Sequence, residues 1–183
     1  MLSESEPDSE TCVLNCSERC KHLSFCERYF KFFYAIDLRD GYCEDELLLL
    51  HSNDICVITL APTHPALRAV STVSFDLSSG NLVNNKVSGK RKRGAKRLKP
   101  KDVICEVVCE DKVYLIRNWL DGNLLEVNTT LLSEPHLLKT EPQGRGFIAI
   151  VNVSGTSHKQ FEKFFSSDKY LLFVTNGRKL NMD

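Results

Sequence analysis

Residues 103–127 read VICEVVCEDKVYLIRNWLDGNLLEV, and this stretch decides the fold. It contains three short runs of mainly apolar residues, at Val103–Cys109, Val113–Ile116 and Leu124–Val127. The polar pairs Glu110-Asp111 and Asp121-Gly122 separate the runs and are typical of turns. Several short strands divided by turns favour a mainly β fold, a barrel or a sandwich, over an alternating α/β fold.

The same alternation of strand and turn extends toward the N-terminus. Leu47–His51 and Ile55–Ala61 flank a short polar stretch, which predicts a β-hairpin. His51, placed before the turn, is interpreted as a hydrogen-bonded structural residue. Val70–Leu77 is a further candidate strand, and Gly80-Asn81 predicts the turn that follows it.

Toward the C-terminus, Phe147–Val153 is an apolar run that predicts the last core strand. Ser166 and Ser167 are suitable N-caps for a short terminal helix that passes through Phe173. Asn176-Gly177 should end this helix, because glycine readily adopts the left-handed conformation found after helix C-termini.

The 183 residues suffice for one domain with a tail. We expect an acidic, cysteine-containing flexible tail at 1–25, a domain at 26–176 and a flexible end at 177–183. The spacing of the aromatic residues in Tyr29–Tyr34 fits neither a helical nor a strand repeat, so the sequence does not decide between helix and strand there. The longest aliphatic run, Leu47–Leu50, is far too short to cross a membrane.

The charge distribution is uneven although the net charge is zero. Because basic and acidic residues each total 24, the chain outside residues 86–101 has a net charge of −9. We predict an exposed basic loop at 86–101, where clustered charge serves nuclear localisation or binds an acidic surface. It contains no acidic residue and these nine basic ones: Lys86, Lys90, Arg91, Lys92, Arg93, Lys96, Arg97, Lys99 and Lys101.

Eight cysteines raise the question of disulfides and metal sites. The acidic N-terminus does not resemble an export signal, so we expect an intracellular protein with reduced cysteines. Cys56, Cys105 and Cys109 lie in apolar runs and should act as small hydrophobic residues. The N-terminal cysteines lack the paired spacing of most zinc sites, so a reduced tail is favoured over zinc bound by Cys12, Cys16 and Cys20 with Cys26 or His22.

Residues 122–150 read GNLLEVNTTLLSEPHLLKTEPQGRGFIAI and resemble the second half of the glycine-cleavage H protein. The shared features are a Gly-x-x-x-Glu-Val-Asn strand, a Pro-x-Leu turn and Pro-x-Gly-x-Gly before an aromatic strand. The resemblance implies a barrel-sandwich hybrid, the fold of lipoyl and biotinyl carrier domains. With the terminal helix, we therefore expect a mainly β, carrier-like domain.

A second resemblance covers about residues 26–175. HSNDICVITLA at 51–61 with His64-Pro65, followed by NKVSGK at 85–90 and KRGA at 92–95, is similar to the Abitram family, also called Simiate. These small proteins are described as actin-binding and associated with nuclear speckles and actin-rich cell projections. The resemblance therefore implies actin as partner, and a location in the nucleus, the cytoplasm and such projections.

A carrier function would require one lysine at the tip of a hairpin. The position that matches the carrier lysine is Asp111, and the neighbouring residue is Lys112. A one-residue slip sends a side chain to the opposite face of a strand. A lipoyl-type acyl carrier that uses Lys112 is thus the alternative function, and otherwise Lys112 is a solvated turn residue.

No catalytic motif is present, and the five histidines are scattered, so we expect neither an enzyme nor a bound cofactor or metal. A nucleic-acid-binding module is a third possibility, but the basic window lacks interleaved aromatic residues for base stacking. We predict instead a non-enzymatic actin-binding protein that also meets a nuclear import receptor and no membrane. The predicted contact residues are Lys90, Arg91, Lys92, Arg93, Lys96 and Arg97.

Overall fold

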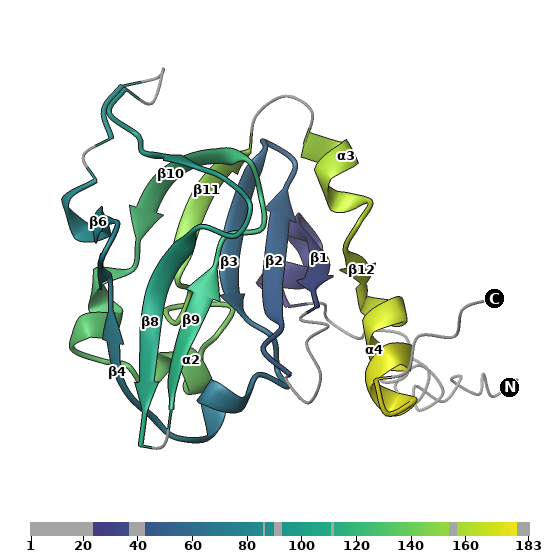
Figure 1. Ribbon diagram of the computed structural model, residues 1–183. Coiled ribbons are helices and arrows are strands. Elements are labelled where there is room, and N and C mark those ends of the chain that lie inside the picture. The colour runs from purple at the N-terminus through teal and green to yellow at the C-terminus, as the bar shows by residue number, and fades with distance from the viewer. Residues whose placement is uncertain are drawn as a thin grey trace, which may run out of the picture.

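The computed structural model describes residues 24–36, 43–85, 87–89, 93–110, 112–153 and 157–178, the side chains of 157 and 158 excepted (Figure 1). The predicted N-terminal tail up to residue 23 lies outside these ranges, as does Asp111. Cys12, Cys16, Cys20 and His22 are therefore not described, and within the described ranges no three metal-binding side chains come together. No described helix has the length and apolar character to cross a membrane.

The larger of the two main sheets has seven strands, and all its pairs are antiparallel. The predicted hairpin is confirmed, since its two arms pair from Glu46↔Leu60 to Leu50↔Cys56. In spatial order the strands are β12 (Phe165–Ser166), β1 (Phe30–Ala35), β2 (Glu46–His51), β3 (Ile55–Leu60), β11 (Ala149–Val153), β10 (Gly122–Val127) and β7 (Arg97–Leu98).

The second main sheet contains β4 (Val70–Ser74), β8 (Val103–Cys109) and β9 (Val113–Arg117), and in Figure 1 it lies across the larger one. Side chains from both sheets form one buried core, for example Ile58 and Val151 with Ile104 and Ile116. A minor pair, β5 (Asp76–Leu77) and β6 (Gly80–Asn81), extends one edge. The predicted turn at Gly80-Asn81 therefore begins earlier, at Ser78-Ser79, and Gly80 supplies its positive φ of 114°.

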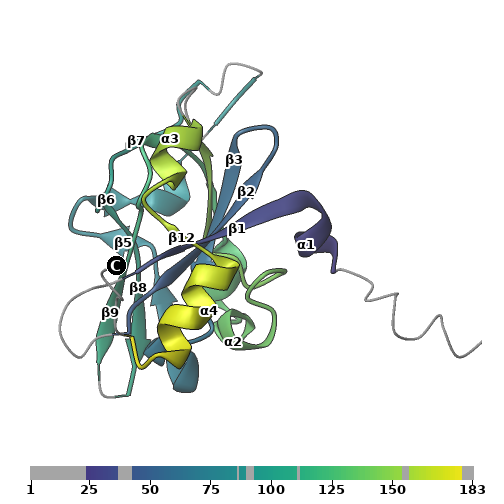
Figure 2. The ribbon, with the colours of Figure 1, turned by 90° about the vertical axis from the view of Figure 1, so that its right-hand side faces the viewer.

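Strand β2 explains why Leu47–Leu50 reads as an unbroken apolar run. Leu48 and Leu50 face the main core, whereas Leu47 and Leu49 face a smaller cluster with Tyr34 and Tyr170. A strand that is buried on both faces has no solvent side on which to place polar residues. Tyr170 belongs to the terminal helix α4 (Ser167–Thr175), which covers this second face beside β1 (Figure 2).

The remaining elements are short. The aromatic stretch at Tyr29–Tyr34, for which helix and strand both remained open, spans the last residue of α1 (Phe25–Tyr29) and most of β1. Ser24 and Glu27 form a capping box at the start of α1. The terminal helix ends at Asn176, and Gly177 has a φ of 64°, as predicted. The other helices are α2 (Leu137–Thr140), α3 (Ser157–Phe161), and the 3-10 turns η1 (Pro65–Arg68), η2 (Leu82–Asn84) and η3 (Thr129–Leu132).

A buried ion pair joins the end of the described chain to the sheet. Arg178 donates to both carboxylate oxygens of Asp45, at 2.7 and 2.9 Å, and the hydroxyl of Tyr170 donates to Oδ2 at 3.0 Å. The side chain of Asp45 is fully buried, so losing Arg178 would leave a buried carboxylate less compensated. The packed part of the chain therefore extends past residue 176 to Arg178.

The smaller predictions on cysteine and histidine also agree with the structure. Cys56, Cys105 and Cys109 are buried in the hydrophobic core, and burial raises the pKa of Cys56 and Cys105. His51 Nδ1 lies 2.7 Å from Asn53 Oδ1, so this histidine is hydrogen-bonded within its turn as expected.

Candidate functional site at the base of the basic segment

The basic segment, residues 86–101, is brought together near its middle by a backbone bridge. Ser88 and Arg93 exchange two hydrogen bonds of 3.0 Å, and Gly89 and Gly94 beside them have φ values of 69° and 83°. Glycine is favoured at both positions because side chains rarely tolerate such angles. Of the predicted contact residues, Arg93, Lys96 and Arg97 are described, while Lys90, Arg91 and Lys92 lie outside the described residues.

The second half of the basic segment contains β7 and therefore joins the seven-stranded sheet instead of forming an open loop. Asn85 accepts from the backbone N–H of Lys96 at 2.9 Å and donates to the carbonyl of Leu124 at the same distance. The N–H of Leu124 in turn donates to the carbonyl of Lys96, and β7 then pairs with β10. Leu98 fills the core at 1% exposure, so the backbone that carries the neighbouring cations is held in place.

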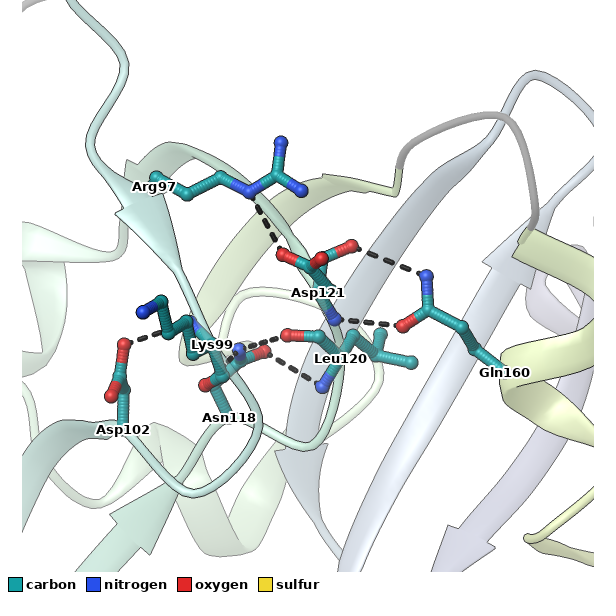
Figure 3. Close-up of polar contacts among 7 residues, drawn as sticks. All are labelled: Arg97, Lys99, Asp102, Asn118, Leu120, Asp121 and Gln160. Atoms are coloured by element: carbon teal, nitrogen blue, oxygen red, sulfur yellow. Dashed lines mark hydrogen bonds and ion pairs between the residues drawn. The ribbon is translucent and has the colours of Figure 1, made fainter.

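Beyond β7, the turn from Lys99 to Asp102 is organised by the amide of Asn118 (Figure 3). This fully buried amide donates to the carbonyls of Lys99, at 2.9 Å, and Leu120, and it accepts from the N–H of Leu120. Its backbone also pairs with the turn, at 2.6 Å to the N–H of Lys101 and 2.7 Å to the carbonyl of Asp102. Lys101 takes up a left-handed conformation with a φ of 77°.

A second group of contacts binds the neighbouring loop to α3. Arg97 Nε donates to Asp121 Oδ1 at 2.8 Å, and the backbone of Asp121 exchanges hydrogen bonds with the side chain of Gln160 (Figure 3). The hydrogen bond from Arg97 holds the pKa of Asp121 below its ordinary value. Both charged side chains remain about half exposed, so solvent screens this ion pair.

The result is a cationic surface on a fixed base. Arg97 is neutralised by Asp121, whereas Arg93, Lys96, Lys99 and Lys101 form no ion pair within the described ranges. The ammonium of Lys96 donates to the carbonyl of Ser79, at 3.4 Å. Such a surface can attract and orient an acidic partner.

The sequence predicted the charge of this site but missed the residues that organise it. Asn118 and Gln160 contribute through hydrogen bonds to segments far away in the chain, whereas the Asp102 carboxylate accepts from the backbone N–H of Lys99, three residues earlier. The only local signal was the polar interruption after the apolar run ending at Ile116, since Asn and Asp favour turns. Nothing in that signal identified Lys99 as the partner of Asn118.

The hairpin between β8 and β9 carries the candidate carrier lysine. The N–H of Cys109 donates to the carbonyl of Lys112 at 2.9 Å and closes the turn. The ammonium of Lys112 lies 2.5 Å from Glu44 Oε1 and 4.7 Å from the centre of the Tyr114 ring. Lys112 is therefore not a merely solvated turn residue, and an amine held in this way does not fit the role of a swinging lipoyl attachment point.

Comparisons with known proteins agree with both resemblances. No protein-family model matches the chain. The crystal structure of a glycine cleavage system H protein from Mycobacterium marinum superimposes with a TM-score of 0.52 at 16% identity, over 72% of this chain and 91% of that one. This likeness confirms the predicted barrel-sandwich hybrid fold.

Curated relatives are similar at the sequence level. Protein Abitram of Xenopus tropicalis is 41% identical over 141 residues, which cover 74% of this chain and 77% of that protein. The human protein Abitram is 40% identical, with 70% and 74% covered, and the Dictyostelium discoideum protein is 38% identical, with 68% and 73% covered. The chain therefore belongs to the Abitram family.

Proposed function

We propose that this protein is a non-enzymatic actin-binding protein that modulates actin polymerisation and cell-projection dynamics, and that the basic segment is its main contact. The observation that carries the proposal is the set of cations on a fixed base, where Lys96, Lys99 and Lys101 have no described carboxylate partner. Because the backbone beneath these lysines is already ordered, binding an acidic protein costs mainly the conformational freedom of their side chains.

The charge distribution supports an electrostatically steered encounter. The basic segment carries nine cations, while the remainder of the chain has a net charge of −9. An acidic partner is thus attracted to one region and repelled by the rest, which orients the approach. Added salt screens such an attraction over about 10 Å at 0.1 M ionic strength.

Co-sedimentation with filamentous actin over a range of salt concentrations tests the proposal. The parent protein should bind less as salt rises, and replacing Arg93, Lys96, Lys99 and Lys101 by Gln should remove most of that dependence. A matched control neutralises four exposed lysines outside the segment: Lys31, Lys139, Lys159 and Lys169. Salt-independent binding, or equal loss in the two variants, would show that the basic segment is not the actin contact.

A nuclear role is proposed for the same segment, because Lys90–Arg93 is a cluster of four consecutive cations. Such clusters bind the acidic groove of nuclear import receptors. In a fusion too large to diffuse through nuclear pores, replacing Lys90, Arg91, Lys92 and Arg93 by Gln should lower nuclear accumulation, measured by imaging. The four control replacements should leave it unchanged. Unaltered import of the Lys90–Arg93 variant would refute the nuclear role.

The lipoyl carrier alternative is disfavoured by the contacts of Lys112. Its ammonium pairs with Glu44, a side chain that is 10% exposed, and releasing it would leave that carboxylate in a poorly solvated site. Intact mass after co-expression with a lipoylating system tests the alternative. An added lipoyl group that disappears in Lys112→Ala would replace the binding proposal by a carrier function.

A further inference from the structure

Next to the basic segment, a groove of about 310 Å³ lies between the end of β1 and the segment joining α3 to β12. Its lining is mainly apolar, and four of the lining side chains are aromatic. Its volume is at the low end for binding pockets, which suits one or two large side chains. The walls and rim include Tyr34, Trp119, Phe164, Phe165, Lys101 and Lys163.

Three of the aromatic side chains that form the walls each contact another residue of the protein. The indole of Trp119 donates to Glu46 at 2.8 Å, Tyr34 stacks on Tyr170 with ring centres 3.9 Å apart, and Phe165 meets Phe173 edge to face. Each ring is therefore fixed by a partner inside the protein. Rigid aromatic walls favour binding because little conformational freedom remains to be lost.

The rim of the groove is cationic. Lys163 donates to the carbonyl of Trp119 at 3.2 Å and lies over the Phe164 ring, and neither it nor Lys101 pairs with a carboxylate in the described part of the chain. The described lining contains no acidic side chain. Partial burial lowers the pKa of Lys163, because removing water disfavours the charged ammonium.

The position of Lys101 on this rim depends on the polar network at the base of the basic segment. Its left-handed backbone is maintained by hydrogen bonds with Asn118 and Arg117. A non-glycine residue in this conformation is held there by its surroundings and is often part of a functional site. Lys101 also makes the groove continuous with the cations of the basic segment.

We propose that this groove binds an acidic peptide segment of a partner protein, with one large apolar side chain between the aromatic walls and adjacent carboxylates on Lys101 and Lys163. The aromatic lining selects the apolar anchor, and the lysines select its acidic neighbours. The proposal goes beyond actin binding and does not depend on actin being the partner.

The chain provides a direct reporter, because Trp119 is its single tryptophan. The probe is a short synthetic peptide with one leucine flanked on both sides by glutamates in a Gly-Ser background. Titrating it into the full chain should change Trp119 fluorescence to saturation. The same peptide with serine in place of leucine, or with lysines in place of the glutamates, should bind much more weakly.

Two variants distinguish the effect of the rim lysines from the effect of overall charge. K101G/K163Q removes both rim charges, and glycine relieves the left-handed strain at residue 101, so the variant should fold at least as stably. K31Q/K139Q removes the same charge from exposed positions outside both the groove lining and the basic segment. We expect about a tenfold loss of peptide affinity in the first variant and less than about twofold in the second.

Three results would overturn the proposal. The first is no saturable change with the leucine peptide, and the second is equal binding of the serine peptide, which would indicate charge attraction alone. The third is Trp119 emission that depends on protein concentration and not on peptide, which would assign the groove to a second copy of the chain. Actin co-sedimentation is unaffected by these outcomes, so the two proposals fail separately.

Discussion

Strand β8 has a lysine-bearing turn at each end, and the two turns differ in how their charges are used. Before the strand, Lys99 and Lys101 have backbones fixed by Asn118, while their ammonium groups form no ion pair with a described residue. After the strand, the ammonium of Lys112 is itself held, by Glu44 and Tyr114. The first turn offers charge to a partner, and the second uses charge within the fold.

The contrast shows why a carrier-like fold need not imply a carrier function. The hairpin is present, but its lysine contributes to packing, whereas the cations available for binding lie on the other end of the same strand. Function resides in such local sites and not in the fold as a whole.

The largest expected effect on stability comes from removing the Asn118 hydrogen bonds that organise the first turn. Asn118→Ala leaves the carbonyls of Lys99 and Leu120 without their buried donor, so we expect a loss of about 2–3 kcal/mol in the free energy of unfolding. Urea denaturation measures it. Asn123→Ala is the matched control, because this amide forms no side-chain hydrogen bond with described residues, and it should cost less than about 0.5 kcal/mol. Equal losses would remove the special role given to Asn118.

A smaller effect is expected at the second turn. Lys112→Ala removes the ion pair with Glu44 and the contact with Tyr114, and since Lys112 is 38% exposed, we expect a loss of about 1 kcal/mol in the free energy of unfolding. Lys139→Ala, at an exposed position, serves as the control. If Lys112→Ala leaves the free energy of unfolding unchanged, Glu44 does not hold the ammonium of Lys112, and the two turns do not differ in the way described.

The smallest effect concerns the half-exposed pair of Arg97 and Asp121. Because Arg97 lowers the pKa of Asp121 in the folded protein, the pair stabilises the fold above the unfolded carboxyl pKa of about 3.9. This stability is lost as pH falls through the folded pKa. Arg97→Gln should therefore be less stable than the parent at neutral pH and equal to it in strong acid, as thermal unfolding at several pH values would show. A difference that persists in acid would point to lost packing instead.

The parts of the fold that follow local rules were predictable from the sequence. The apolar runs that became β3, β8 and β9 keep alternation or β-branched enrichment, and Gly177 marks the end of α4. These signals act over a few residues, so pattern reasoning detects them.

The base of the site was not predictable for the opposite reason. Asn118 bonds to Lys99, 19 residues away, and Asp121 to Gln160, 39 residues away, and only the fold brings them together. In the sequence, Leu98 alone indicated that part of the basic segment joins the sheet. The nine cations of the segment favoured an exposed loop instead. The groove combines β1, Trp119 and the segment before β12, which no single motif unites.

Lysine reactivity in the presence and absence of actin tests the central claim most directly, since it compares the two turns in one experiment. The full chain is acetylated at low reagent concentration with and without filamentous actin, and each lysine is quantified by mass spectrometry. We expect actin to protect Lys96, Lys99 and Lys101, while Lys112, already held by Glu44, reacts slowly and equally in both samples. Protection of Lys112 with no change at Lys96, Lys99 and Lys101 would contradict the central claim.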